Sequence, residues 1–152
     1  MTDSNLEVLK YDTYISIIKN SVGSRLFNSF IVRSKATGDT EDILKDGEYS
    51  ASFFVSSVLS LVQAVDKPTT TESGLERKLD EDKHWFEVSL EEVEAGDVLF
   101  YADTTLVDGS TETHVGFALD DNQAVSISDQ LRQVTKHDLR LMPIKKIYRY
   151  IW

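Results

Sequence analysis

Apolar residues gather most densely in the segment 51–65, ASFFVSSVLSLVQAV, where they fall on nearly every side of a helical projection. A helix that is apolar all round is packed on more than one face. The alternative is a buried strand, but the segment is longer than the usual β-strand. The pattern therefore predicts a helix over 51–65 in the centre of the structure.

Weaker periodic patterns surround this segment. Helical spacing of apolar residues predicts an N-terminal helix over about 4–21, which Gly23 would end. The stretch ESGLERKLDED predicts a short amphipathic helix through Leu75 and Leu79. Residues 25–35 fit a helix end followed by a short strand, and the polar, turn-rich residues 36–50 are typical of a surface loop.

After residue 96 the sequence pattern changes to short apolar runs separated by turn residues. The expected strands are 97–102, 114–120, 123–129 and 144–152. The turn signal EAGD leads into the first strand, VDGS separates the first from the second, and DDNQ separates the second from the third. Helices followed by a run of strands indicate an α+β fold, with an antiparallel sheet packed against the central helix. Neither an internal repeat nor a second domain is indicated, so residues 1–152 are expected to form a single domain.

The net charge and the lengths of the apolar runs limit the kinds of partner that the chain can bind. The formal net charge is −10, from 26 acidic and 16 basic residues, which argues against a nucleic-acid partner because phosphate binding needs a basic surface. The acidic surface fits either solubility or attraction of a cationic substrate. No apolar run approaches the ~18–20 residues of a membrane span, and the first residues do not resemble a signal peptide. We therefore expect no membrane partner and a cytoplasmic protein as the chain is written.

Candidate chemistry is limited by the residue types present. The absence of cysteine excludes disulfides and thiolate metal sites, and three dispersed histidines lack metal-ligand spacing, so neither a metal nor a cofactor is expected. His84 reads as a surface residue and His137 as a residue bonded locally beside Asp138. His114 differs, because it opens a predicted strand directly after a long polar loop. An imidazole there is suited to proton transfer, and Gly116 on the same face leaves room for another group.

Three motifs, taken in order, resemble one family. The helix start YSASFFVSSVL, the turn and strand EEVEAGDVLFY, and the strands HVGFALDDNQAVSIS are similar to the core of the NlpC-type cell-wall peptidases, which belong to the papain-like superfamily with the CHAP amidases. In that family an Asp-Cys-Ser-Gly-Phe-Val stretch opens the central helix, a Pro-Gly-Asp turn precedes the first strand, and His-Val-Gly opens the second. The resemblance covers roughly residues 45–130.

Most of the family positions carry matching residues. Ser52, Phe54 and Val55 match the helix motif, Gly96 and Asp97 match the turn, and His114, Val115 and Gly116 match the strand of the catalytic base. Phe53 replaces the family's glycine and Ala95 stands where proline is usual. The nucleophilic cysteine falls on Ala51, and the third, orienting residue falls on Ser126, where His, Asn or Gln would be expected.

The resemblance implies a fold and an activity. The fold would be papain-like, with a core of about 45–152 and the N-terminal helix added outside it, where it would shape or cover the groove. The activity would be hydrolysis of an amide in a peptide or peptidoglycan-like substrate held in the cleft. A cysteine at position 51 would be the nucleophile, His114 the general acid and base, and Ser126 its orienter, while the backbone N–H of residue 51 would help to bind the oxyanion.

Ala51 itself has two explanations. It is either an engineered substitution that silences an active enzyme, or a natural feature of a pseudoenzyme that binds a peptide or a protein. A third possibility is an interaction domain that works through its negative surface. Ser50 and Ser52 are poor substitutes for the nucleophile, because successive helical residues point about 100° apart; Ser52 is instead expected to satisfy backbone N–H groups at the helix start.

Overall fold

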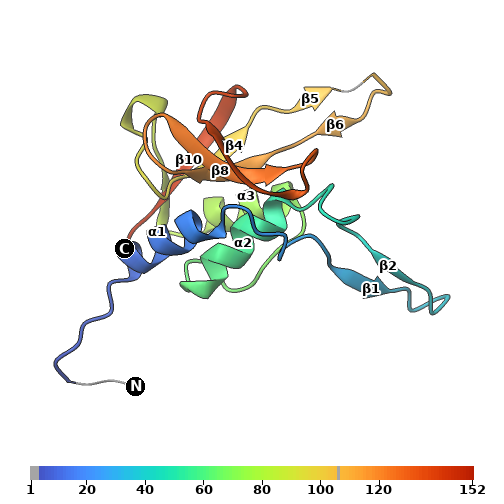
Figure 1. Ribbon diagram of the computed structural model, residues 1–152, viewed down its shortest axis with the longest axis horizontal. Helices are drawn as coiled ribbons and strands as arrows, with labels where there is room; N and C mark the ends of the chain where they lie inside the picture. The colour runs from blue at the N-terminus through green and yellow to red at the C-terminus, as the bar shows by residue number, and fades with distance from the viewer. Residues whose placement is uncertain (1–3, 106) are drawn as a thin grey trace.

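The computed structural model describes residues 4–105 and 107–152, and it has an α+β fold (Figure 1). Within this described part, three α-helices cover one face of a six-stranded antiparallel sheet. The helices are α1 (Lys10–Ser21), α2 (Ala51–Leu61) and α3 (Glu72–Glu81). The sheet has the strand order β3-β10-β4-β7-β8-β9, with bounds β3 Trp85–Glu87, β4 Val98–Tyr101, β7 Val115–Ala118, β8 Gln123–Ser128, β9 Gln133–Asp138 and β10 Ile144–Tyr150.

Two small hairpins project from one side of the molecule (Figure 1). The first pairs β1 (Ile31–Arg33) with β2 (Thr40–Asp42), and the second pairs β5 (Thr104–Thr105) with β6 (Thr111–Glu112). A short 3-10 helix, η1 (Leu90–Glu92), precedes β4. Residues 43–50 connect β2 to α2, and residues 113 and 114 connect β6 to β7.

Helix α2 is buried on several faces, as its apolar pattern predicts. Phe54, Val55, Val58 and Leu59 are fully buried, and they belong to one core with side chains of α1, α3 and the sheet. The helix begins at residue 51 as expected but ends at Leu61, because Gln63 adopts a left-handed conformation with φ of 62°. Val62, Ala64 and Val65, which the sequence pattern places in the helix, are buried after its end.

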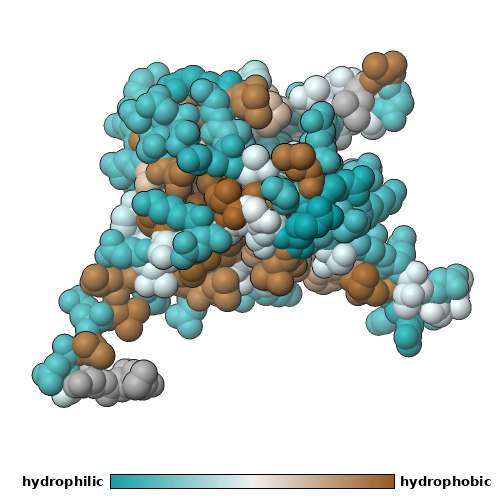
Figure 2. Space-filling model, in the orientation of Figure 1, coloured by the Kyte–Doolittle hydropathy of each residue, from teal (hydrophilic) through white to brown (hydrophobic). Residues whose placement is uncertain are grey.

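The outer face of the sheet has its own smaller core. The central strands β4 and β7 are buried along their whole length, because one side of each strand contacts the helices and the other contacts a second apolar cluster. This cluster consists of Val93, Leu99, Tyr101, Ala118, Ala124, Leu139 and Ile147. Figure 2 shows a largely hydrophilic surface around exposed hydrophobic groups, as expected from the acidic composition.

Several elements differ from the sequence expectation. The N-terminal helix starts at Lys10 rather than near residue 4, and Leu6 and Val8 before it are exposed. The region 36–50, expected to be a loop, contains β2. Strands β3 and β9 were not predicted; both are edge strands, and β9 has the polar sequence QVTKHD in which only Val134 is buried. Edge strands need fewer apolar residues, so their pattern is weak.

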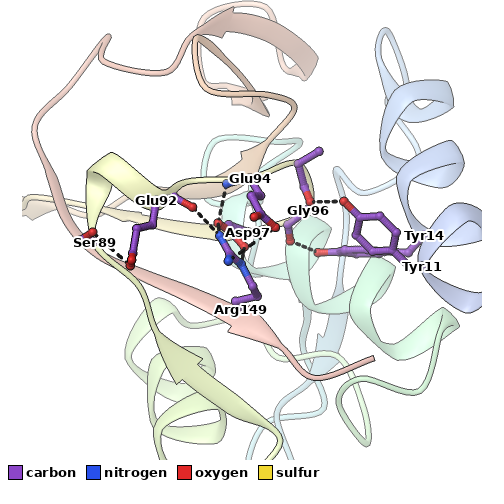
Figure 3. A network of polar contacts seen from close by, with 9 residues as sticks. Tyr11, Tyr14, Ser89, Glu92, Glu94, Gly96, Asp97 and Arg149 are labelled. Carbon is purple, nitrogen blue, oxygen red and sulfur yellow. Dashed lines mark hydrogen bonds and ion pairs between the residues drawn. The ribbon is translucent and has the colours of Figure 1, made fainter.

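The Gly96–Asp97 turn connects α1 to the sheet (Figure 3). Arg149 of β10 binds the buried Asp97 carboxylate in a bidentate manner, with its Nε and Nη2 each 2.8 Å from a carboxylate oxygen. Tyr14 of α1 donates a 2.6 Å hydrogen bond to the Gly96 carbonyl. Gly96 has φ of 93°, and a Cβ there would lie 2.8 Å from the Tyr14 ring, so glycine is required. Helix α1 is therefore part of the main core.

Helix α2 offers a matched pair of leucines for a stability test. Leu59→Ala should lower the free energy of unfolding by about 2–5 kcal/mol, because it leaves a cavity in the core. Leu61→Ala, at a position that is 67% exposed, should change it by less than about 0.5 kcal/mol. Urea denaturation of both variants measures the difference, and equal effects would show that α2 is not the centre of the core.

Candidate functional site

A cavity of about 620 Å³ lies at the start of α2, between the chain segments that follow the two hairpins. Ala51 is the first residue of α2 and is half-buried at this cavity. His114 immediately precedes β7 and is also half-buried in its lining. The structure therefore brings the two residues with the leading roles in the sequence analysis to one cavity, which we call the cleft.

The N-terminal end of α2 lies at the cleft. Ser50 is the N-cap residue, and its carbonyl accepts the first helical hydrogen bond from the Phe54 N–H at 2.9 Å. The N–H groups of the first turn have no partner within the helix, and the helix dipole makes this end electropositive. Among the described residues, no side chain caps the start of α2, contrary to the role expected for Ser52, which is buried.

His114 belongs to a chain of hydrogen bonds that crosses three neighbouring strands. Its Nε2 lies 2.8 Å from Oγ of Ser126 on β8. The same Oγ lies 2.6 Å from Nε2 of His137 on β9. The other ring nitrogen of His137, Nδ1, lies 2.8 Å from the backbone carbonyl of Asp138. We call this set the His114–Ser126–His137 relay.

The direction of the relay follows from its last member. A carbonyl oxygen only accepts, so Nδ1 of His137 must donate to Asp138, and Nε2 of a neutral His137 is then an acceptor. The Ser126 hydroxyl consequently donates to His137 and accepts from Nε2–H of His114. This assignment leaves Nδ1 of His114 unprotonated, with a lone pair available as a base or as a hydrogen-bond acceptor.

Gly116 makes the contact between His114 and Ser126 possible. A Cβ at this position would lie 2.8 Å from the Val125 carbonyl oxygen and 2.9 Å from Cβ of Ser126. Any side chain would push β8 away from β7 and separate the Ser126 hydroxyl from the imidazole. The room that the sequence analysis expected beside Gly116 is therefore occupied by Ser126.

The surroundings keep His114 neutral. Its pKa is lowered from 6.5 to about 4, first by burial and second by the nearby His137, against an opposite effect of Asp129. At neutral pH the imidazole therefore retains its basic lone pair. The Tyr101 ring lies 5.7 Å from the His114 ring and 6.2 Å from the His137 ring, and it forms part of the apolar packing around the relay.

The structure places Ala51 and His114 at one cavity, joins His114 to Ser126, and adds His137, for which the sequence predicts only a local hydrogen bond. The local bond exists, with the Asp138 backbone, but the other ring nitrogen holds Ser126. Recognising β9 as a strand beside β8 would have revealed this, because Ser126 and Thr135 are paired and His137 lies on the same face as Thr135. His84 is a surface residue bonded to Asp82, as expected.

The sequence matches no protein-family model, and no curated protein matches it either. Within residues 4–105 and 107–152, no group of three or more His, Cys, Asp or Glu side chains could hold a metal ion. In the same part of the chain, no helix has the length and apolar character needed to cross a membrane.

His137 can be tested through its effect on His114. His137→Gln should raise the pKa of His114 above about 4, because it removes a neighbouring group that disfavours the imidazolium. The pKa should remain below 6.5, because burial is the larger cause. NMR titration of the His114 ring protons measures the shift, with His84→Gln as a control; an unchanged His114 pKa in His137→Gln would contradict the relay's electrostatic contact.

The depressed pKa also predicts how stability depends on pH. The unfolded chain binds a proton at His114 near pH 6.5 and the native protein only near pH 4, so the free energy of unfolding should fall as the pH falls through this window. The loss from His114 is on the order of 3 kcal/mol. This loss should be absent in His114→Gln. The difference between the stability–pH profiles of the parent chain and of His114→Gln therefore gives the contribution of His114 alone. Parallel stability–pH profiles for the two proteins would contradict the lowered pKa of His114.

Proposed function

We propose that this chain is a papain-like hydrolase domain of the NlpC type in which Ala51 occupies the position of the nucleophilic cysteine. The observation that carries the proposal is the relay at the cleft, which orients a neutral His114 in the wall of the same cavity that the first residue of α2, Ala51, lines. The α+β arrangement, with α2 packed on β7 and β8, supports the same proposal.

The chemistry of the domain follows from these positions. A thiol at residue 51 would lie at the electropositive helix start, which favours the thiolate, and the lone pair on Nδ1 of His114 could accept its proton. The thiolate would attack a peptide carbonyl, and His114 would return the proton to the leaving amine. Ser126 and His137 act as positioning residues, because they fix the tautomer and the orientation of His114.

The methyl group of Ala51 supports none of these steps. The chain as written is therefore expected to hydrolyse no peptide or peptidoglycan amide. The second candidate function is a pseudoenzyme that binds a peptide or a protein in the same cleft. The observation that favours it is the cavity of about 620 Å³, which is open to a ligand although the nucleophile is missing.

Restoring the thiol tests the catalytic origin of the site. In Ala51→Cys, the thiol pKa should lie well below the ordinary value of about 8.5, and the pKa of His114 should rise at the same time. The chain contains no other cysteine, so the pH dependence of alkylation by iodoacetamide reports on this thiol alone. Mass spectrometry of peptidoglycan stem peptides incubated with Ala51→Cys then tests for hydrolysis of an amide.

Two matched variants complete this experiment. Leu61→Cys places a thiol on the exposed side of the same helix and should titrate near about 8.5. Adding His114→Gln to Ala51→Cys should raise the pKa of the thiol back toward that value. An ordinary thiol pKa in Ala51→Cys, unaffected by His114→Gln, would contradict the proposal.

A further inference from the structure

Another cavity, of about 380 Å³, lies where the start of α1 meets the end of β10 and the turn before β4. Its lining combines three aromatic rings, those of Tyr11, Tyr150 and Trp152, with the charged groups of Glu94 and Arg149. Among the described residues, none lines both this cavity and the cleft. The chain after β10 ends beside the start of α1, away from the two hairpins (Figure 1). We call this separate cavity the aromatic pocket.

The ring of Trp152 is held in the wall of the aromatic pocket by three tyrosines. Its centroid lies 4.8 Å from the rings of Tyr14 and Tyr150 and 5.9 Å from that of Tyr11. Tyr14 is fully buried and its hydroxyl is bound to the Gly96 carbonyl, so it anchors Trp152 to the core. Trp152 is nevertheless 42% exposed and Tyr11 is 38% exposed. The pocket therefore presents aromatic surface that is already ordered, which lowers the entropic cost of binding.

Glu94 and Arg149 supply hydrogen-bonding groups of opposite kinds in the same pocket. Nε and Nη2 of Arg149 bind the Asp97 carboxylate, and Nη2 also donates to the Glu92 carbonyl (Figure 3). The third nitrogen, Nη1, lies 3.5 Å from Oε2 of Glu94, which is longer than an ordinary hydrogen bond. The Glu94 side chain is 67% exposed. Nη1 and the Glu94 carboxylate thus retain hydrogen-bonding capacity for a ligand.

This pair of groups selects a neutral ligand with hydroxyl groups. A hydroxyl both donates and accepts, so one hydroxyl can accept from Nη1 of Arg149 and donate to the Glu94 carboxylate. A cationic ligand would be repelled by Arg149, and an anionic one by Glu94 and Asp97. A hydrocarbon ring would fit the aromatic walls but would leave the polar pair without a partner.

We propose that the aromatic pocket binds the pyranose ring of a neutral carbohydrate. Such a ring carries C–H groups on its faces and hydroxyl groups around its edge. A face can pack on Trp152 or Tyr11 while a hydroxyl at the edge binds Glu94 and Arg149. Aromatic walls with a few polar groups that fix orientation are typical of small-molecule sites. The site goes beyond the proposed hydrolase chemistry and shares no residue with the relay.

Three small probes separate the contribution of the ring from that of the hydroxyl groups. Methyl β-D-glucopyranoside has both, sorbitol has hydroxyl groups without the ring, and tetrahydropyran has the ring without hydroxyl groups. Each probe is titrated at pH 7 into the ¹⁵N-labelled chain and followed by the indole N–H signals in NMR spectra. The glucoside should shift the Trp152 signal and saturate at millimolar concentrations. Sorbitol and tetrahydropyran should bind at least about tenfold more weakly.

The chain contains its own control for this measurement. It has two tryptophans, and Trp85 is 6% exposed with its Nε1–H donating to the Ala64 carbonyl. The Trp85 indole signal should therefore shift much less than that of Trp152. Equal shifts of the two signals would overturn the placement of the carbohydrate in the aromatic pocket.

Matched variants test the two kinds of contact. Trp152→Ala should weaken glucoside binding by at least about tenfold, followed here by the backbone amides of residues 94–97. Phe86→Ala removes a ring of similar exposure, 44%, outside the pocket and should change the affinity by less than about twofold. Glu94→Gln should weaken binding by about fivefold, because it removes a charged acceptor. Glu91→Gln, an equal charge change in η1 outside the pocket, should change it by less than about twofold.

Glu94→Gln also keeps the test decisive if Trp152→Ala loses its fold. The Glu94 side chain is largely exposed, so the urea midpoint of Glu94→Gln should stay close to that of the parent chain. The inference is overturned by any of three results: no saturation with the glucoside, equal affinity for sorbitol or tetrahydropyran, or unchanged affinity in Glu94→Gln.

A cationic probe distinguishes the carbohydrate site from an aromatic cage for a quaternary ammonium. Tetramethylammonium chloride should bind more weakly than the glucoside, because Arg149 lies in the pocket. Tighter binding of tetramethylammonium would overturn the inference. All of these titrations use the chain with Ala51 in place and measure no thiol chemistry, so their failure is distinguishable from a failure of the proposed hydrolase origin.

Discussion

The hydrogen-bond chain from Asp138 through His137 and Ser126 to His114 is the constraint on which the account of this protein depends. Each member takes its role from the next: the carbonyl fixes the ring of His137, which fixes the hydroxyl of Ser126, which fixes the tautomer of His114. The sheet supplies the spacing, since the relay crosses three adjacent antiparallel strands. The base at the cleft is therefore oriented by the packing of the whole sheet.

The relay also explains why a serine can occupy a position where a stronger orienting group was expected. Ser126 alone is a weak partner for an imidazole, because its hydroxyl could rotate toward other acceptors. With His137 behind it, the hydroxyl donates in one direction and its lone pair faces His114. In the proposed hydrolase domain, the two residues together would perform the orienting role that His, Asn or Gln would perform alone. This arrangement requires a third strand, β9, to stay in register with β8.

The sequence pattern predicts the buried helices and strands of this structure better than the strands at the edges of its sheet. The apolar pattern of α2, the amphipathic pattern of α3 and the runs that form β4, β7, β8 and β10 were predicted, because buried segments record their environment in consecutive side chains. Strand β9 was missed, because Val134 alone of its residues is buried. That omission hid His137, whose Nε2 accepts from the Ser126 hydroxyl.

The central claim is that His114 is held neutral with its proton on Nε2 and its lone pair on Nδ1. Long-range nitrogen–proton NMR correlation of the His114 ring at neutral pH measures this most directly. We expect one tautomer, with the Nδ1 chemical shift of an unprotonated nitrogen and the Nε2 chemical shift of a protonated one. A proton on Nδ1, or rapid exchange between both tautomers, would contradict it.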